Sequence, residues 1–460
     1  MTDVNISSRP NIASRVERLT FTRTMWFWAT LLALGMFWDA FQLYSASTIA
    51  LHFFAILNAK VFGAYLSAAF FGGTFTGAIF FAILGDRLGR RNVFAITLSV
   101  MGLGDLIAVL SINGAMLFTG MTIAGFGAGV QIPLNSTYAQ EISPTKRRGK
   151  VNTYNLMIGF SGGTIGIFAA ALLVPLNAVI PGYKILLIVM VIGAFSSLII
   201  RSLLPESPRW LERVGKLDKA DEVMTYIESK VKADLKIEKL PEPEIIPEKE
   251  SKRNLLDVLF GKNYRRRTAG AWIIEFAQGF GFYGLVALVP SFFYTLGYSV
   301  FSSILYTGIV ALSYPIGAAV TYPLIERMQR RSGIVIFYFL NMVFGIAFVL
   351  SGVYHSPIEL IVAFGFLTEM MIFIDGPFLH TYEIEIYPTY LRSTAGGISY
   401  SFDRLGGFVA PLIGAYLIVA VASGYTIVFT IGAVMWGLCS LVGYFLTIKT
   451  TGTPLEELEV

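Results

Sequence analysis

The sequence predicts an all-α membrane protein with twelve transmembrane helices in two pseudo-symmetric six-helix bundles. Of its 460 residues, 55% are hydrophobic and only 14% are charged, which is too apolar for a soluble protein of this length. Apolar stretches of about 20 residues, the length that crosses about 30 Å of hydrocarbon, recur twelve times along the chain. The segments EISPTKRRG, from Glu141, and EIYPTYLRS, from Glu385, repeat Glu, Pro and Arg in one register, 244 residues apart. This repeat indicates duplicated halves.

Each predicted span is read as a helix, because backbone polar groups that face lipid must pair within their own segment. The first six spans are predicted at 25–50, 60–84, 92–112, 115–139, 152–174 and 182–204, and the last six at 269–295, 300–325, 333–353, 358–386, 394–420 and 424–447. The predicted domains are an N-terminal tail at 1–24, a first bundle at 25–204, a linker at 205–268, a second bundle at 269–447 and a C-terminal tail at 448–460.

Lys and Arg residues collect in alternate connections between the spans. Arg87, Arg90 and Arg91 follow the second span, and a basic run at 146–150 follows the fourth, whereas the intervening connections are nearly bare. By the positive-inside rule, these connections and both termini are expected on the cytoplasmic side of the plasma membrane. The same bias explains the net charge of +5, so no nucleic-acid partner is needed. In the linker, PEPEIIPEKE is too rich in Pro and Glu to pack and is expected to act as a hinge.

Three motifs resemble the major facilitator superfamily of transporters. GDRLGRR at 85–91 is similar to the signature that follows the second span, and ERMQRR at 326–331 is a weaker echo of it. PESPRWL at 205–211 resembles the sugar porters and the related organic ion carriers and metabolite:proton symporters, and KTTGTPLEE at 449–457 resembles the ending of the same groups. The resemblance covers essentially the whole chain. It implies a central site at mid-membrane and alternating access by rocking of the halves.

Charged residues at the cytoplasmic ends of the spans are expected to form a gate whose ion pairs form and break during this motion. The expected pairs join Asp86 to the arginines that follow it, Glu141 to Arg148, and Glu385 to Arg392. An exposed pair contributes only about 0–1 kcal/mol, which suits a switch. The alternative is a solvated charge run that sets topology alone. The expected gate consists of Asp86, Arg87, Arg90, Arg91, Glu141, Arg148, Glu206, Arg209, Glu326, Arg327, Glu385 and Arg392.

The residues that the resemblance would assign to sugar binding are replaced in this chain. Leu156 stands at the glutamine position of span five, Trp272 and Ile273 stand at the glutamine pair of span seven, and His380 stands at the tryptophan position of span ten. The segment QIPLNSTYAQE resembles phosphate symporters, but Gln131 replaces their aspartate. The resemblance therefore implies the architecture without the hexose or the phosphate, and the expected substrate is a small organic solute such as an acid.

Ionisable residues inside the spans are functional candidates, because a charge at the centre of a bilayer costs about 2.5–3.5 kcal/mol on insertion scales. Asp39 in span one is the candidate for the coupling proton, and its alternative role is a structural hydrogen bond. Arg404 in span eleven offers a bidentate fork for a carboxylate, or simply pairs with Asp403. The resemblance to organic ion carriers favours an anion at this position. His380 in span ten exchanges protons near neutral pH, or only packs.

Neutral polar and aromatic residues within the spans complete the expected site. With Arg404 and His380, the substrate-binding candidates are Gln131, Asn155, Gln278, Tyr283, Trp272 and Tyr44. Each of the neutral residues could instead hold neighbouring helices together. Asp105 in span three and Glu275 in span seven are expected near the aqueous ends of their spans, and therefore to contribute less.

The sequence thus predicts a secondary active transporter that moves a small organic solute, an organic acid or a related metabolite, by proton symport. A sugar porter with a remodelled pocket and an uncoupled facilitator or exporter are the alternatives. A receptor is disfavoured because no signalling domain is present, and an enzyme because the chain has no GxxxxGKS loop or metal-ligand cluster and its three histidines are scattered. The expected partners are the substrate, protons and membrane lipids. No cofactor, metal ion or nucleic acid is expected, and the chain is expected to be a monomer.

Overall fold

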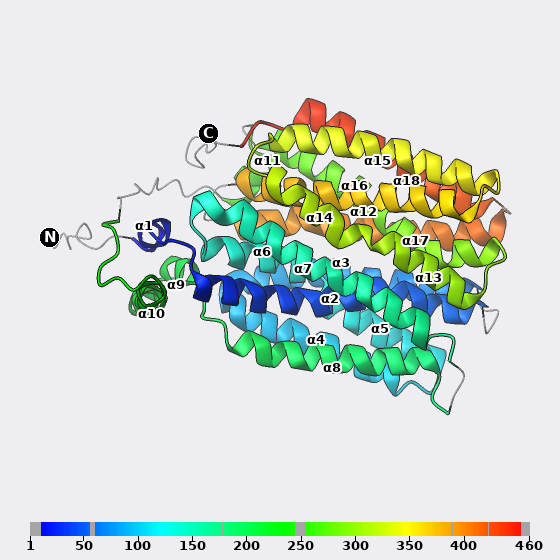
Figure 1. Cartoon of the computed structure of the whole chain (residues 1–460), viewed down its shortest axis with the longest axis horizontal. Coiled ribbons are helices and arrows are strands. Elements are labelled where there is room, and N and C mark those ends of the chain that lie inside the picture. The colour runs from blue at the N-terminus through cyan, green and yellow to red at the C-terminus, as the bar shows by residue number, and fades with distance from the viewer. Residues whose placement is uncertain are drawn as a thin grey trace.

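The computed structural model describes residues 11–55, 60–176, 179–243, 254–262, 264–387, 391–421 and 423–451. Long helices run side by side along one axis of the molecule (Figure 1). Three expectations lie wholly or partly outside the described residues: the N-terminal tail up to residue 10, the hinge segment from residue 244 to 253, and the C-terminal tail from residue 452.

The long helices of the described chain form two sets of six spans. The first set is α2 (Arg23–Ala55), α3 (Lys60–Leu88), α4 (Arg90–Val109), α5 (Gly114–Ala128) with α6 (Gln131–Glu141), α7 (Arg148–Leu173) and α8 (Gly182–Ser202). The second set is α12 (Arg265–Thr295), α13 (Val300–Ala311) with α14 (Ser313–Leu324), α15 (Arg330–Val353), α16 (Ile358–Glu385), α17 (Arg392–Ala420) and α18 (Gly424–Leu446). Among the described residues, spans four and eight are thus each broken in two.

Proline explains both breaks. A proline lacks the N–H that would bond to the carbonyl four residues earlier, and its ring clashes with that carbonyl. Pro133 lies just after the break between α5 and α6, and Pro315 lies just after the break between α13 and α14. Pro315 leaves the carbonyl of Ala311 without its helical partner, and the hydroxyl of Thr164 on α7 donates a hydrogen bond to it. The second break therefore also joins the two halves.

Nine of the described spans are long and apolar enough to cross a membrane by composition alone. α2, α16 and α17 are the other three. They contain most of the predicted site: Asp39 lies on α2, His380 lies on α16 with five acidic residues, and Arg404 lies on α17 beside Asp403. The three helices with the least apolar composition are thus those that carry most of the ionisable candidate residues, as expected of helices that face a polar interior.

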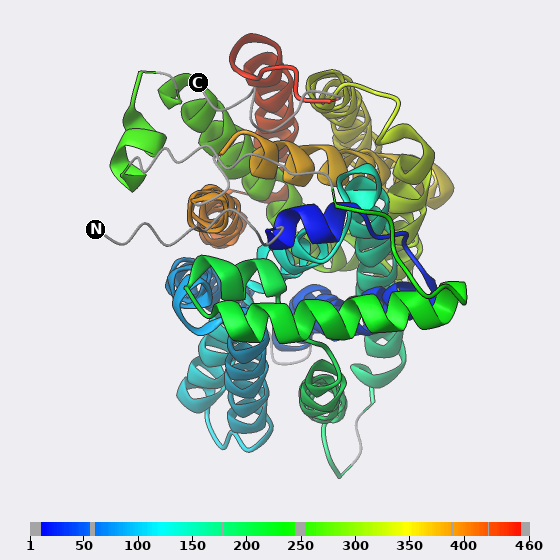
Figure 2. The ribbon, with the colours of Figure 1, turned by 90° about the vertical axis from the view of Figure 1, so that its left-hand side faces the viewer.

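The two halves share one helix contact, in which a pair of glycines lets two helices approach closely. This contact shows which residue of one half corresponds to which residue of the other. Gly162 on α7 lies against the backbone of α2, and Gly406, 244 residues later on α17, lies against the backbone of α12. The neighbouring glycines repeat the pattern, because Gly163 lies against the ring of Tyr44 and Gly407 against the ring of Tyr283. Tyr44 and Tyr283 are 239 residues apart. Figure 2 looks down the helix axes at the two halves, which meet through α3 against α17 and through α7 against α13 and α14.

Short helices cover one end of the bundle (Figure 1), and we call this the basic end. They are α1 (Ile12–Glu17), α9 (Pro208–Arg213), α10 (Leu217–Leu235) and α11 (Leu255–Phe260). The amphipathic helix α10 lies across the end of the first half (Figure 2). Its buried side chains join a separate hydrophobic cluster with residues of α1 and the start of α2.

A substitution at Gly125 tests the close approach of α3 and α5. A side chain at this position would place its Cβ 2.1 Å from the carbonyl oxygen of Phe70. We expect Gly125→Val to destabilise the protein by about 1–3 kcal/mol or more, because backbone rather than a movable side chain must shift. Thermal unfolding of the purified protein measures this. Gly376→Ala is the control, since its Cβ meets nothing within 4 Å, and an equal loss in both variants would contradict the packing argument.

Candidate functional site

Aromatic rings from both halves meet at the centre of the bundle. Tyr44 on α2 lies 5.9 Å from Phe282 on α12 and 5.0 Å from Tyr314 on α14, measured between ring centroids. Tyr314 stacks on Phe373 of α16 at 4.2 Å, and Phe160 of α7 lies 4.6 Å from the same ring. The predicted candidate Tyr44 thus belongs to a central aromatic cluster to which both halves contribute.

Arg404 is fully buried beside this aromatic cluster, with 0% of the residue exposed. Its guanidinium donates hydrogen bonds to the hydroxyl oxygens of Tyr283 and Tyr400, and its carbon lies 5.1 and 4.9 Å from the centroids of these two rings. Asp403 also contacts it, but Nε lies 3.9 Å from the carboxylate Oδ2, which is too far for a hydrogen bond. Asp403 therefore compensates the buried cation only in part.

Asp39 is buried on α2, with 1% of the residue exposed. It lies within electrostatic range of both Arg404 and Tyr44. Gln278 occupies the corresponding position of the second half, 239 residues later. The carboxylate of Asp39 is therefore not a requirement of the shared fold at this position, since a neutral side chain serves in the other half.

The other predicted binding residues divide into two groups. Gln131 donates a hydrogen bond to Thr97 on α4, and Trp272 donates one to Ser399 on α17, so these two hold helices together. In the described part of the chain, both amide atoms of buried Asn155 and the Oε1 of Gln278 have no hydrogen-bond partner. A polar ligand could satisfy them.

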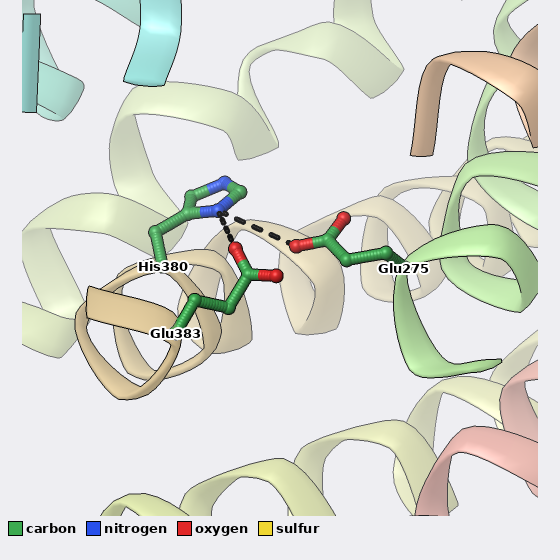
Figure 3. Close-up of side chains that lie close together, drawn as sticks. All are labelled: Glu275, His380 and Glu383. Carbon is green, nitrogen blue, oxygen red and sulfur yellow. Dashed lines mark ion pairs between the residues drawn. The ribbon is translucent and has the colours of Figure 1, made fainter. Parts of the chain in front are cut away.

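His380 belongs to a buried ionisable cluster that the sequence did not predict. Its Nδ1 lies 3.8 Å from Oε1 of Glu275 and 3.8 Å from Oε2 of Glu383. Figure 3 shows the two carboxyl groups, from α12 and α16, pointing toward the imidazole ring. The three groups lie within 4.8 Å of one another, close enough for one cation to contact all of them. The spacing of His380 and Glu383, three residues apart on one helix face, was the available sequence signal.

The sequence placed Glu275 and Asp105 near the aqueous ends of their spans, and in the structure protein surrounds both side chains. Both residues are 0% exposed. Glu275 lies ten residues into α12, where the helix is surrounded by the second half, and Asp105 accepts a hydrogen bond from Gln42 on α2 at 2.7 Å. Position along a span does not give burial, because neighbouring helices decide how much of a side chain they cover.

A cavity lies between the two halves near the basic end. It encloses about 530 Å³, including space open to solvent. Residues of α3, α6, α16 and α17 line it, and His380, Glu383 and Tyr400 are among them. These helices end or begin close by, at Leu88, Glu141, Glu385 and Arg392. The ionisable cluster therefore borders a space that opens toward the basic end of the bundle.

Ion pairs at the basic end differ from the expected ones. Glu141 pairs with Arg90 at 2.9 Å, and Glu385 pairs with Arg330 at 3.5 Å. Both arginines also make the same second contact. Arg90 donates a hydrogen bond to the backbone carbonyl of Gly85, and Arg330 donates one to that of Ile325, in each case five residues earlier. The repeated Glu register therefore reflects a repeated contact with the arginine that starts α4 or α15.

The remaining gate residues are distributed over the same end. Arg148 and Arg209 both pair with Glu17 at 3.1 Å, and the backbone N–H of Arg91 donates to Glu206. Arg87, Glu326 and Arg327 are exposed, whereas the side chains of Asp86 and Arg392 lie outside the described residues. The two pairs of Glu17 join the N-terminal helix α1 to the first half and to the linker, the contact of Arg91 joins the first half to the linker, and none of these contacts bridges the two halves.

Helix α1 is held on α10 by a charged network. Arg15 and Arg18 donate hydrogen bonds to Glu228, and Arg15 also pairs with Asp221. Burial alone would raise the pKa of the Glu228 carboxyl, but the hydrogen bonds from the two arginines outweigh it and hold the pKa below its usual range. A depressed carboxyl pKa stabilises the folded form above the unfolded pKa, and this contribution disappears as pH falls through the folded pKa.

We expect Glu228→Gln to weaken the docking of α1 by about 1.5–3 kcal/mol, since the variant loses hydrogen bonds between charged groups. Limited trypsin digestion at neutral pH should cleave the variant faster than the wild type at Arg15 and Arg18. Glu222→Gln is the matched control, because Glu222 is an exposed residue of the same helix. Equal cleavage of the two variants would contradict this role.

Two duplicated six-helix halves around a buried polar centre define a membrane transporter of the major facilitator type. The structure is similar to that of the proton:xylose symporter XylE bound to 6-bromo-6-deoxy-D-glucose, with a TM-score of 0.75 at 19% identity over 97% of this chain and 98% of that chain. The predicted fold class is confirmed. The protein is a multi-pass membrane protein.

Residues 22–460 match the family described as "Sugar (and other) transporter", and the chain belongs to this family. It is 28% identical to YyaJ of Bacillus subtilis (strain 168), with 97% of each chain covered. It is also 26% identical to the niacin transporter NiaP of Acinetobacter baylyi (strain ATCC 33305 / BD413 / ADP1), covering 97% of this chain and 99% of that protein. This is a family of transporters and not of enzymes, as the sequence predicted.

Proposed function

We propose that the protein takes up a small ring-bearing organic acid into the cytoplasm together with a proton. The observation that carries the proposal is Arg404, a fully buried guanidinium beside an aromatic surface formed by both halves. A substrate carboxylate can accept its planar fork of donors, while the substrate ring packs among Tyr44, Tyr314 and Phe373. Both parts of such a solute thereby find a matching surface.

Coupling to protons follows from the competition of two anions for one cation. Asp39 and a bound substrate carboxylate would both be stabilised by Arg404, and two carboxylates in a dry site repel each other. Substrate binding is therefore favoured when Asp39 carries a proton, and proton binding is favoured when substrate is present. Movement of the loaded form transfers both together, which is symport.

The relatives support an acid as substrate. One named relative transports niacin, a pyridine ring with a carboxyl group. The arabinose-proton symporter of Bacillus subtilis (strain 168), at 25% identity over 86% of each chain, supports the second candidate, a sugar. Against the sugar, Leu156 offers an apolar side chain at the span-five glutamine position. An acid also explains the buried Arg404, because a carboxylate compensates the positive charge of the guanidinium and a neutral sugar does not.

We assign the basic end to the cytoplasm of a plasma-membrane protein that works as a monomer. Lys and Arg residues gather at this end, where α1, α9 and α10 lie, and positive residues are retained on the cytoplasmic side. The charged pairs of Arg90 with Glu141 and Arg330 with Glu385 would then anchor the cytoplasmic ends of each half. The cavity bordered by His380 would face the cytoplasm.

The proposal is tested with the purified full chain in proteoliposomes. Radiolabelled nicotinate, benzoate, a monocarboxylate, glucose and an organic cation are offered with and without an inward proton gradient. Accumulation of a ring-bearing acid that requires the gradient is the expected result. Sugar equilibration that is indifferent to the gradient would contradict both the substrate and the coupling, and acid transport without accumulation would indicate a facilitator.

A further inference from the structure

The Glu275, Glu383 and His380 cluster has no counterpart in the first half. In the correspondence set by Gly163 with Gly407 and Tyr44 with Tyr283, the α2 residue that matches Glu275 is Met36. The α6 residues that match His380 and Glu383 are Ser136 and Ala139, each 244 positions earlier. The same packing of helices is therefore achieved in the first half without ionisable groups, so the cluster is not a requirement of the fold.

Glu275 is a fully buried acid of the cluster whose carboxyl group favours a bound proton. Its side chain is 0% exposed, and within the described part of the chain neither carboxyl oxygen has a hydrogen-bond partner. It points at His380 and Glu383 (Figure 3), and the three groups bring ligand atoms within 4.8 Å of one another. Two carboxylates this close repel each other when both are ionised. A proton shared between them removes the repulsion and satisfies the buried oxygens.

Charged and titratable groups surround the cluster on every side. Asp403 on α17 interacts electrostatically with His380, Glu383 and Arg404. The groups within reach from the other elements are Tyr400 and Arg404 of α17, Tyr338 of α15, Cys439 of α18, and Tyr387 after α16. Arg404 is the cation among these groups, and it interacts electrostatically with both Glu275 and Asp403. Any change of charge at Arg404 is therefore sensed by the cluster.

We propose that Glu275 and Glu383 bind a second transported proton, which His380 releases into the cavity at the basic end. The proposal rests on the proposed function, because it assigns this proton to the same symport cycle. His380 is the member of the cluster nearest to solvent, with 15% of its side chain exposed, against 0% for Glu275 and 4% for Glu383. It also lines the cavity.

The release step is a proton transfer. The O–H bond of the Glu275 carboxyl breaks, the proton passes to Nδ1 of His380, and the imidazolium then gives it to water in the cavity. Because 3.8 Å is longer than a hydrogen bond, the imidazole ring must first rotate toward Glu275. Substrate release frees the Arg404 charge, which favours ionised carboxylates nearby and so drives the proton out.

The first test needs no substrate. Infrared difference spectra of the purified full chain between high and low pH report the C=O stretch of protonated carboxyl groups. We expect Glu275→Gln to remove one such band, and His380→Gln to keep the band but shift the pH at which it forms. Asp375→Asn is the matched control, since Asp375 is a fully buried acid of the same helix as His380 and Glu383 that lies outside the cluster. It should leave the Glu275 band in place.

The second test uses transport. With nicotinate as the probe, Glu275→Gln should keep exchange across the membrane. It should lower accumulation about tenfold for a pH gradient of one unit, because only the Asp39 proton stays coupled. Asp375→Asn should keep both exchange and accumulation. Accumulation equal to wild type in Glu275→Gln would overturn the proposal. Two spectroscopic results would also overturn it. One is a set of Glu275→Gln spectra that match those of the wild type at every pH. The other is a wild type that shows no carboxyl band and binds Zn²⁺, with this binding lost in Glu275→Gln. If no offered solute is transported, the proposed function fails while the spectra still decide the proton site.

Discussion

Replacing Arg404 with Gln is expected to reduce nicotinate transport about 30- to 3000-fold. Removing one partner of a buried, hydrogen-bonded charge pair costs about 2–5 kcal/mol, and each 1.4 kcal/mol is a factor of ten. The loss has two sources in this site. The substrate carboxylate loses its bidentate partner, and Tyr283 and Tyr400 lose the donor that orients their hydroxyl groups toward the centre. Initial uptake rates over a range of nicotinate concentrations measure the effect.

Arg404→Lys separates charge from shape. An ammonium keeps the positive charge but lacks the planar fork, so we expect partial transport with a raised KM. The double variant Arg404→Gln with Asp403→Asn controls for folding, because it removes the acid that the single variant leaves without its neighbouring cation. A double variant that folds normally and still fails to transport supports substrate binding by Arg404. Full transport by either Gln variant would reduce Arg404 to a structural partner of Asp403.

The fold was predictable because membrane helices must be about 20 apolar residues long and because the chain repeats itself. Asp39 and Arg404 were predictable for a related reason, since a charge in an apolar span needs a function or a partner. The structure places both residues in electrostatic range at the centre of the bundle. Their roles stay predictions, which substitution of each residue tests.

Neighbour relations between helices could not be predicted from one sequence. Glu141 was expected to pair with Arg148, seven residues away, but it contacts Arg90 on another helix, and Arg148 contacts Glu17 from the N-terminal segment. The cluster of Glu275 with Glu383 was missed for the same reason. Those residues lie on α12 and α16, and only the packing of these helices brings their carboxyl groups together.

Asp39→Asn is expected to reduce accumulation while exchange persists. A pH gradient of one unit supplies about 1.4 kcal/mol per proton, which limits one-proton symport to about tenfold accumulation. Asparagine binds no proton in this range, so the variant loses one of the two proposed protons. It should therefore accumulate nicotinate about tenfold less than the wild type for a pH gradient of one unit. Exchange should survive, because Arg404 keeps Asp403, Tyr283 and Tyr400 as partners. Accumulation against the gradient and counterflow, measured in the same proteoliposomes, distinguish these two outcomes.

Asp105→Asn is the matched control for this change. Asp105 is an equally buried carboxylate of the first half, but it accepts a hydrogen bond from Gln42 and lies on α4. An amide can still accept that bond, so we expect accumulation near the wild-type level. Equal loss of accumulation in both variants would mean that any buried acid of the first half matters for folding, whereas normal accumulation in Asp39→Asn would move the coupling proton away from α2. In that case Glu275 and Glu383 are the acids that must carry it, because they combine burial, a neighbouring imidazole and a route to the cavity.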